Sequence, residues 1–504
     1  MFDGWLMDIY TDGAVRRGVA MVFSSLFFLF FFLVLCYGVY PLLPSLRARN
    51  IWLLVFSLIF YAWGGPAYVG LLCLMTLVCY MGALLMPGQA PGSQGRKLCL
   101  WVSVGACLLL LGVFKYTDFL VGSFQGLFGL DGELPGILLP IGISFYTFQL
   151  ISYVVDVYRG ETPPQRSYWK LLLYAALFHQ CIAGPIVRYQ DVRDRIDHRT
   201  VTPDNLFRGL VRFTVGLAKK AVLANACAAV ADSLLPASGA GWGPLSSVTV
   251  LVAMVAYAMQ IYLDFSAYSD MAIGLGLAVG FFYRENFNYP YVATSVTDFW
   301  RRWHISLSSF FRDYVYIPLG GNRCATWRRI LNLVAVWGLT GLWHGASWNF
   351  VLWGLYFALF LILEKFLFRW EPEARGWQRP LRRLYTLVVV FFGWFLFRFE
   401  DLSLTGKALA ALFGFGNGFV DLTARTTLSG NLFLLLACAL ACTPVVPFLS
   451  GKLRELRSRG QSTATRVAGL VTDCVCALSP ALLLLLSTLA LVGNTYNPFL
   501  YFRF

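Results

Sequence analysis

Long apolar segments separated by short polar stretches recur along the whole chain. Those that approach or exceed the ~20 residues needed to cross a bilayer are Met21–Leu43, Tyr68–Met86, Leu98–Phe114, Ile137–Val155, Val248–Leu263, Ser347–Phe368, Leu432–Leu449 and Cys476–Val492. Shorter or more interrupted candidates are Ile51–Trp63, Leu171–Ile186, Val211–Leu235, Phe265–Phe282, Ile330–Leu342 and Leu384–Phe397. The pattern predicts an all-α polytopic membrane protein with about 11–13 membrane helices.

Composition agrees with this pattern. Hydrophobic residues make up 58% of the chain and charged residues 13%, whereas soluble domains carry roughly 25% charged residues. The net charge of +14 comes from short basic loops, such as Arg188–Arg199, Arg301–Arg329 and Lys365–Arg383. Loop Ser233–Ser247 has no Lys or Arg, so the basic loops are expected to face the cytoplasm. The charge therefore indicates topology and contact with a lipid bilayer, and no nucleic acid is expected as a partner.

The predicted domain organisation is simple. Residues 1–20 are mixed in polarity and are expected to form an N-terminal extension or tail, followed by a single membrane domain over 21–504. The apolar run after Arg17 is about twice the length of a signal-peptide core and predicts a retained anchor helix. Most of the 12 cysteines stand singly in apolar runs, and no Cys-x-x-Cys occurs, so no metal site is predicted.

Polar residues that could carry chemistry gather between Gln260 and Ala346, which contains two of the four histidines. The segment from Asp298 to Gly321 is predicted to be one amphipathic helix at the membrane boundary. One face carries Asp298, Arg301, His304, Ser308 and Arg312, and the other is aromatic. Arginines on such a face could hold phosphates. A plain interfacial anchor is the alternative.

His344 lies 15 residues beyond the basic loop that ends at Arg329, which is about 22 Å at 1.5 Å per helical residue. A histidine at that depth is expected to be neutral, because burial disfavours the charged form. A neutral imidazole is what a general base needs, although a structural histidine bonded between helices is the alternative. The small residues Ala335, Gly338, Gly341 and Gly345 predict close approach of a second helix.

Asp264 and Asp270 stand in a further apolar stretch, among Tyr262, Ser266 and Tyr268. A polar network between helices and contact with a substrate are both open for this pair. The chain has no Gly-x-Ser-x-Gly, Walker or His-Glu-x-x-His motif. Acyl transfer assisted by a buried histidine therefore fits these residues better than hydrolysis or ATP-driven transport.

Several motifs together resemble the membrane-bound O-acyltransferase (MBOAT) superfamily, and within it the bacterial AlgI-like branch that O-acetylates alginate and is related to the teichoic-acid D-alanylation protein. They are Pro140–Gln149, Ala183–Ile186 with Arg188, Gln260–Gly276, Glu285–Asn288, Asp298–Arg323, Gly341–Ala346 and Asn497–Phe504. The resemblance implies a ring of tilted helices, with re-entrant or interfacial ones, around a central tunnel. It also implies that His344 matches the invariant catalytic histidine and His304 the second one.

From the resemblance we expect acyl transfer from a cytoplasmic thioester, acetyl-CoA or another, with no bound cofactor. Residues expected to bind the donor or line the tunnel are Arg301, Arg302, Asp298, Ser308, Arg312, Asp264, Asp270 and Trp343. The expected partner is a periplasmic SGNH-type acetyltransferase or the polysaccharide acceptor itself, and the expected location is the bacterial inner membrane. The alternatives are a non-catalytic polysaccharide or lipid transporter, a scaffold, or the same fold with another acyl group such as D-alanyl.

Overall fold

A computed structural model describes residues 21–181, 184–370, 376–459 and 463–493. These ranges contain helices, turns and loops but no strand, which confirms the all-α prediction. The described residues up to Gly209, together with Leu275–Arg284, form one compact unit, and Leu210–Gly274 with the described residues from Glu285 onward form a second. The predicted extension at 1–20 and the motif Asn497–Phe504 lie outside the described residues, and the single domain over 21–504 stays a prediction.

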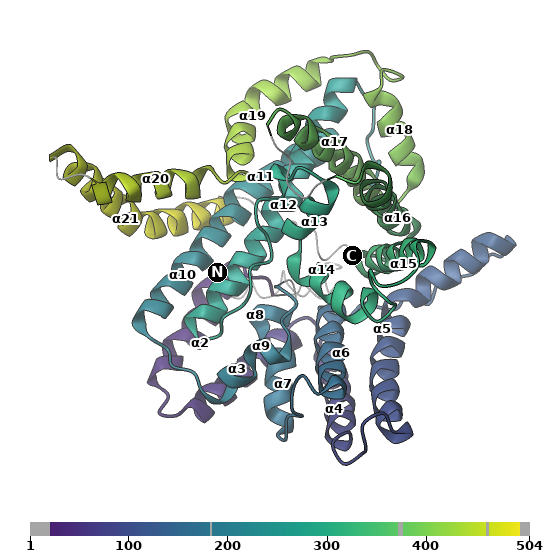
Figure 1. Ribbon diagram of the computed structural model, residues 1–504. Coiled ribbons are helices and arrows are strands. Elements are labelled where there is room, and N and C mark those ends of the chain that lie inside the picture. The colour runs from purple at the N-terminus through teal and green to yellow at the C-terminus, as the bar shows by residue number, and fades with distance from the viewer. Residues whose placement is uncertain (1–20, 182–183, 371–375, 460–462, 494–504) are drawn as a thin grey trace, which may run out of the picture. The chain divides into compact units, whose positions relative to one another are not determined.

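The first unit consists of helices of very different length (Figure 1). They are η2 (Phe28–Phe32), α2 (Leu33–Val39), η3 (Tyr40–Leu42), α3 (Leu46–Ala62), α4 (Pro66–Leu85), α5 (Gln94–Phe128), α6 (Ile143–Arg159), α7 (Tyr168–Ala176), α8 (Phe178–Cys181) and α9 (Tyr189–Asp197). The predicted membrane segment Ile137–Val155 is wrong at its start. Pro140 cannot donate a backbone hydrogen bond and Gly142 has a left-handed backbone (φ 73°), so the helix begins only at Ile143.

The second unit holds most of the polar cluster. Its helices are the end of α10 (Pro203–Ala218), η4 (Lys219–Ala224), α11 (Asn225–Leu234), nearly all of α12 (Ser247–Ala278), η5 (Pro290–Val292), α13 (Val296–Arg302), α14 (Ile305–Phe311), η6 (Arg312–Tyr316), α15 (Thr326–His344), α16 (Trp348–Ile362), η7 (Leu363–Phe368), α17 (Gln378–Arg398), α18 (Leu402–Leu412), α19 (Leu422–Ala441), α20 (Val445–Arg459) and α21 (Thr463–Gly493). Two predicted segments, Val248–Leu263 and Phe265–Phe282, are one continuous helix, α12. Asp264 lies inside this helix, and Lys220 pairs with its carboxylate.

Helices α15 and α16 pack closely against each other, and α17 lies beside α16 (Figure 1). A Cβ atom at Gly341 would lie 3.0 Å from the carbonyl carbon of Phe350, and one at Gly354 would lie 3.0 Å from that of Trp337. Only glycine permits this approach of the two backbones. The predicted small-residue contact is therefore confirmed at Gly341, whereas a Cβ at Gly338 would meet nothing within 4 Å.

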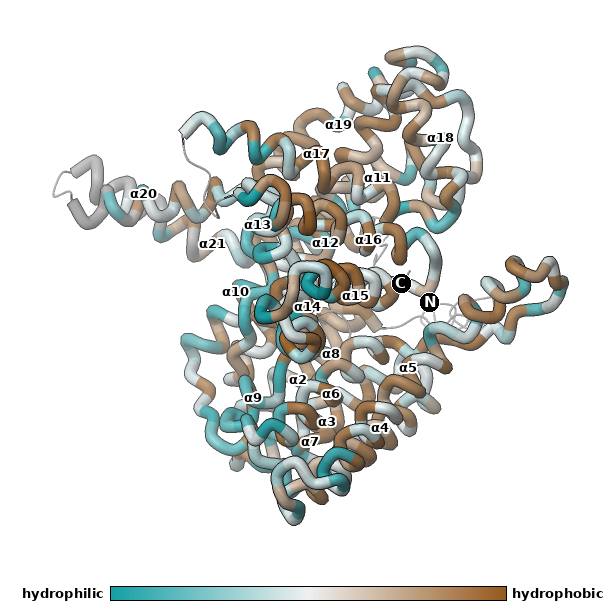
Figure 2. Tube along the Cα trace, turned by 45° about the vertical axis from the view of Figure 1, so that its right-hand side comes forward, coloured by the Kyte–Doolittle hydropathy of each residue, from teal (hydrophilic) through white to brown (hydrophobic). Residues whose placement is uncertain are grey.

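Eight described helices are long and apolar enough to cross a membrane. They are Pro66–Leu85, Gln94–Phe128, Pro203–Leu234, Ser247–Ala278, Trp348–Phe368, Gln378–Arg398, Leu422–Ala441 and Asp473–Gly493. Hydrophobic positions run along helices such as α4 and α5 (Figure 2). Two shorter apolar helices, Phe28–Leu42 and Leu402–Leu412, add to them. The total of about 11–13, which includes interfacial helices, stays a prediction.

Candidate active site

The chain breaks its helix at His304. Helix α13 ends at Arg302, and α14 begins at Ile305, with His304 between them in a left-handed backbone conformation (φ 43°). A π-helical turn, Arg312–Tyr316, then extends α14. The single amphipathic helix predicted over Asp298–Gly321 is therefore wrong, and its residues do not share one continuous face.

Hydrogen bonds from a distant segment stabilise this break. Residues Glu285–Asn288, here called the strap, run alongside it. The backbone N–H of Ile305 donates to the Asn286 carbonyl (2.9 Å), and the Ser306 N–H donates to the Asn286 side-chain oxygen (3.1 Å). The Asn288 N–H donates to the Arg302 carbonyl (2.9 Å). These bonds satisfy groups that a continuous helix would have paired internally, so the break does not leave them unpaired.

His304 is buried, with 1% of its surface exposed. Its Nδ1 lies 3.2 Å from the side-chain oxygen of Asn286, and its ring meets Phe265 edge-on at 4.7 Å between centroids. Burial holds the pKa of His304 well below its usual range, and nearby His344 lowers that pKa further. His304 thus lies buried at the helix break and not on an exposed helix face, and phosphate binding by the arginines near it stays a prediction.

His344 is the last residue of α15, and 5% of its surface is exposed. Aromatic rings surround its imidazole, with Trp353 at 5.0 Å, Phe397 at 5.3 Å and Trp343 at 5.0 Å between centroids. The His304 and His344 rings lie 6.5 Å apart. His344 at the end of α15 and His304 at the break between α13 and α14 therefore share one largely apolar environment. Trp343 also contacts His304 (5.7 Å).

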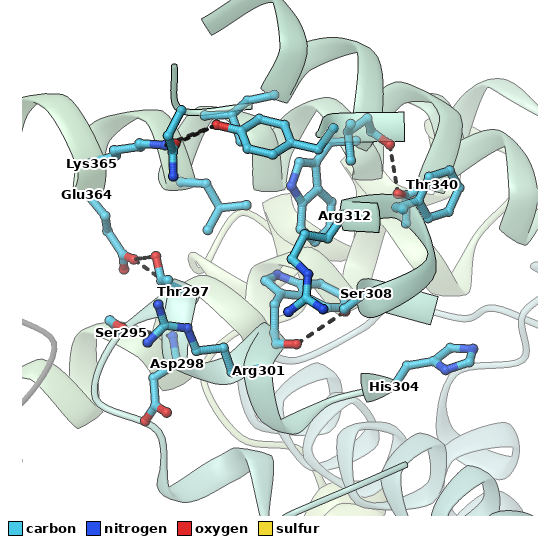
Figure 3. Close-up of a pocket in the computed structure, with 18 of the residues that line it drawn as sticks. Ser295, Thr297, Asp298, Arg301, His304, Ser308, Arg312, Thr340, Glu364 and Lys365 are labelled. Carbon is cyan, nitrogen blue, oxygen red and sulfur yellow. Dashed lines mark hydrogen bonds between the residues drawn. The ribbon is translucent and has the colours of Figure 1, made fainter. Parts of the chain in front are cut away.

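A cavity of about 680 Å³ opens beside this pair. Of the ten residues predicted from the sequence, Asp298, Arg301, His304, Ser308 and Arg312 line it (Figure 3). Its apolar lining includes Trp300, Leu307, Phe311, Val336 and Trp337. Arg302, Trp343, His344, Asp264 and Asp270 are not among its lining residues. The lining of the cavity thus includes charged residues and His304. His344 is not part of the lining, but its ring lies next to that of His304.

Basic side chains outnumber acidic ones in the lining. Five are basic (Arg301, Arg312, Lys365, Arg369 and Arg382) and two are acidic (Asp298 and Glu364), which gives 5 − 2 = +3. Arg312 is paired with Asp313 (2.6 Å). Arg301 has no hydrogen-bond or ion-pair partner among the residues that the structure describes. The cavity is therefore suited to an anionic ligand.

Both acids of the cavity already have partners. Asp298 accepts from Arg302 (2.9 Å). Glu364, which is 5% exposed, accepts from the backbone N–H of Val296 (2.6 Å) and from the N–H (2.9 Å) and hydroxyl (2.7 Å) of Thr297. Figure 3 shows Glu364 reaching Thr297 at the start of α13. A carboxylate at a helix N-terminus is stabilised there by the helix dipole and by the exposed N–H groups.

Asp264 and Asp270 form a polar network away from the cavity. Asp264 pairs with Lys220 (2.8 Å), and both side chains are almost fully buried, at 2% and 1% exposed. Asp270 pairs with Arg212 (2.9 Å) and Lys219 (2.8 Å), and Arg212 also pairs with Glu285 of the strap. The sequence analysis left two interpretations of these acids open, a polar network between helices and contact with a substrate. The structure shows the polar network. Contact of these acids with substrate stays a prediction.

Sequence reasoning missed Asn286 and Glu364. The sequence analysis used the strap only as a family motif and gave Asn286 no role, although Asn286 is fully buried and contacts the break at His304. Glu364 was visible as a lone acid within the apolar run Ser347–Phe368. A carboxylate in such a run is a functional or structural site by default, and that signal would have been enough to select it.

The fold and the site define a multi-pass membrane protein with a cationic cavity and two buried histidines. The profile of the MBOAT, membrane-bound O-acyltransferase family matches residues 164–406. The chain is 39% identical over 511 residues to the "Probable alginate O-acetylase AlgI" of Azotobacter vinelandii, covering 96% of this chain and 100% of the relative. It is 34% identical to the "Peptidoglycan O-acetyltransferase" of Helicobacter pylori, covering 77% of each chain.

A more distant relative is the "Teichoic acid D-alanyltransferase" of Bacillus subtilis, which is 30% identical over 51% of this chain and 68% of its own. The chain belongs to the membrane-bound O-acyltransferase family, in its AlgI-like branch. It is therefore a membrane enzyme that transfers an acyl group to an oxygen.

Proposed function

We propose that this O-acyltransferase takes an acetyl group from a cytoplasmic thioester, acetyl-CoA, and passes it across the bacterial inner membrane. The acetyl group then serves O-acetylation of an extracytoplasmic polysaccharide such as alginate. One observation carries the proposal: His304 lines a cavity with a surplus of basic residues, and its ring lies 6.5 Å from that of His344. The names of its near-full-length relatives support acetyl as the group transferred.

The charge of the cavity supports a nucleotide thioester as donor. Coenzyme A carries a diphosphate and a ribose phosphate, and guanidinium groups bind phosphate oxygens through paired hydrogen bonds. Arg301 and Arg312 stand on one wall, and Lys365 and Arg369 stand on the segment that also carries Glu364. In this arrangement the phosphates occupy the basic part of the cavity and the pantetheine arm extends towards His304.

His344 is the proposed general base. Its imidazole removes the proton from the attacking hydroxyl, and the oxygen forms a bond to the thioester carbonyl carbon. Collapse of the tetrahedral intermediate breaks the carbon–sulfur bond, and the proton on His344 passes to the departing thiolate. The aromatic rings around His344, which is 5% exposed, shield it from bulk water.

The acceptor in this proposal is a periplasmic SGNH-type acetyltransferase or the polysaccharide itself. A transporter or a scaffold without chemistry would not need two buried histidines beside a cationic cavity. Transfer of D-alanyl is the competing chemistry, because two relatives are named teichoic acid D-alanyltransferases. Those relatives cover 51% and 44% of this chain, whereas the alginate O-acetylases cover up to 96%.

Labelled donors test the proposal. Inside-out membrane vesicles from a deletion strain, complemented with the wild-type gene, receive acetyl-CoA labelled in the acetyl group, and alkali-labile label in polysaccharide and membrane protein is counted. The proposal predicts ester-linked label with the wild type and none with His344→Ala at equal abundance. If D-alanine were incorporated in place of acetyl, acetyl-CoA would not be the donor. If His344→Ala incorporated as much label as the wild type, His344 would not be the general base.

A further inference from the structure

Asn286 is the point at which the strap and the broken helix meet. Its side chain is fully buried. The side-chain oxygen accepts from the Ser306 N–H (3.1 Å) and from the Ser306 hydroxyl (2.9 Å), and it also faces His304 Nδ1 (3.2 Å). The side-chain nitrogen donates to the hydroxyl of Ser269 (3.1 Å) on α12. Every polar atom of this amide therefore has a defined partner.

These contacts determine the proton on His304. A backbone N–H can only donate, so the Asn286 atom that faces Ser306 N must be the amide oxygen and not the nitrogen. The same oxygen faces Nδ1 of His304, and an oxygen without a hydrogen can only accept. The Ser306 hydroxyl also lies 3.4 Å from Nδ1, but it lies closer, at 2.9 Å, to the Asn286 oxygen and gives its one hydrogen to that oxygen. Nδ1 therefore carries the hydrogen of its contact with Asn286. Because burial keeps the imidazole neutral, Nε2 is left without one.

We propose that Asn286 is a positioning residue for acyl transfer: its side-chain oxygen holds His304 in the tautomer protonated on Nδ1, so that Nε2 acts as an acceptor. The inference rests on the proposed function, in which His304 takes part at the end of the donor cavity. A neutral Nε2 without hydrogen repels phosphate oxygens and binds a group that brings its own hydrogen. The amide N–H groups of the pantetheine arm, which extends towards His304 in the proposed function, are such groups, so Nε2 orients the thioester, whereas the attacking hydroxyl gives its one hydrogen to His344.

The network behind Asn286 fixes this orientation from two sides. Ser269 binds its amide nitrogen from α12, and Phe265, one turn earlier on the same helix, packs against the His304 ring. Glu285, the neighbouring strap residue, pairs with Arg212, which also holds Asp270 of α12. Asp270, one of the two acids that the sequence analysis singled out, is thus linked through Arg212 to the strap.

The first test reads the tautomer directly, without any activity assay. The chain has four histidines, so ¹⁵N-histidine labelling gives few imidazole signals, and His304 is assigned by its loss in His304→Gln. We expect a protonated Nδ1 and an unprotonated Nε2 in the wild type, and a mixture in Asn286→Ala. A protonated Nε2 in the wild type, or an unchanged spectrum in Asn286→Ala, would overturn the proposal.

The second test uses Asn286→Asp, which keeps the size and the accepting oxygens but adds a negative charge. That charge favours the imidazolium form of His304, so the acidic limb of the pH–rate profile should move to higher pH. Among the described residues, His344 is the titratable group whose ring contacts His304, and the other rings against His304 (Phe265, Phe287 and Trp343) carry no charge. An unshifted profile would contradict the assignment.

Asn288 supplies the matched control. It lies two residues along the same strap, but its side chain is exposed, so Asn288→Ala and Asn288→Asp should leave kcat and the pH profile unchanged. Asn286→Ala should lower kcat at least about tenfold, with KM for acetyl-CoA changed much less. Full activity of Asn286→Ala would overturn the positioning role. If the wild type used no acetyl-CoA, the proposed donor would be wrong, while the ¹⁵N spectrum would still decide the tautomer.

Discussion

Replacement of Gly341 by alanine tests how α15 is held, and therefore how His344 is positioned. A Cβ there would lie 3.0 Å from the Phe350 carbonyl carbon, closer to its oxygen, and 3.4 Å from the Gly354 nitrogen. All three atoms belong to the backbone of α16 and cannot rotate away. Overpacking of this kind costs about 1–3 kcal/mol, whereas alanine in a helix gains about 0.5–1 kcal/mol over glycine. The net expectation is a loss of up to about 2.5 kcal/mol.

Gly338 is the matched control, because it lies one turn earlier on α15 and a Cβ there would meet nothing within 4 Å. Gly338→Ala should therefore be neutral or stabilising by up to about 1 kcal/mol. Thermal unfolding of the purified variants in detergent, followed by size-exclusion chromatography, measures the difference. Gly341→Ala should melt below the wild type and lose activity, because His344 follows three residues later. Equal melting of the two variants would refute the close approach of α15 and α16.

Three further predictions follow from the site. Glu364→Gln should destabilise the protein by about 1–2 kcal/mol, because the N–H groups at the start of α13 lose a charged acceptor; chemical unfolding measures this. Arg301→Ala should raise the KM for acetyl-CoA about tenfold, whereas the exposed Arg323→Ala, outside the cavity, should not; steady-state kinetics decide. The depressed pKa of His304 means that the unfolded chain binds its proton first as pH falls. Stability should therefore decline below pH ~6.5 by up to ~1.4 kcal/mol per pH unit, and His304→Gln should flatten that slope in melting curves.

The membrane helices could largely be predicted from the sequence, because they depend on local properties. Apolar length predicted the spans, and small-residue spacing predicted the contact at Gly341. Boundaries were less accurate. Asp264 appeared to divide two segments, yet α12 runs through it, and Lys220 of η4, far away in sequence, pairs with the buried acid. Periodicity contains no information about such a partner.

The break at His304 was missed for the same physical reason. The spacing of Asp298, Arg301, His304 and Ser308 satisfies a helix, and nothing within that segment stops it. The hydrogen bonds that stabilise the break come from Asn286, 18 residues earlier. Both histidines could be selected from the sequence, because titratable groups in an apolar chain are few. Their shared aromatic environment and the tautomer of His304 depend on tertiary contacts.

The central claim is that His344 performs chemistry in the membrane. The most direct measurement is the O-acetyl content of the polysaccharide in a deletion strain complemented with wild type, His344→Ala or His198→Ala, with the membrane abundance of each protein measured. His198 is the control, because its side chain is exposed on a loop. The account predicts loss of acetylation with His344→Ala and normal acetylation with His198→Ala. Normal acetylation with His344→Ala at equal abundance would contradict it and leave a scaffold or transport role.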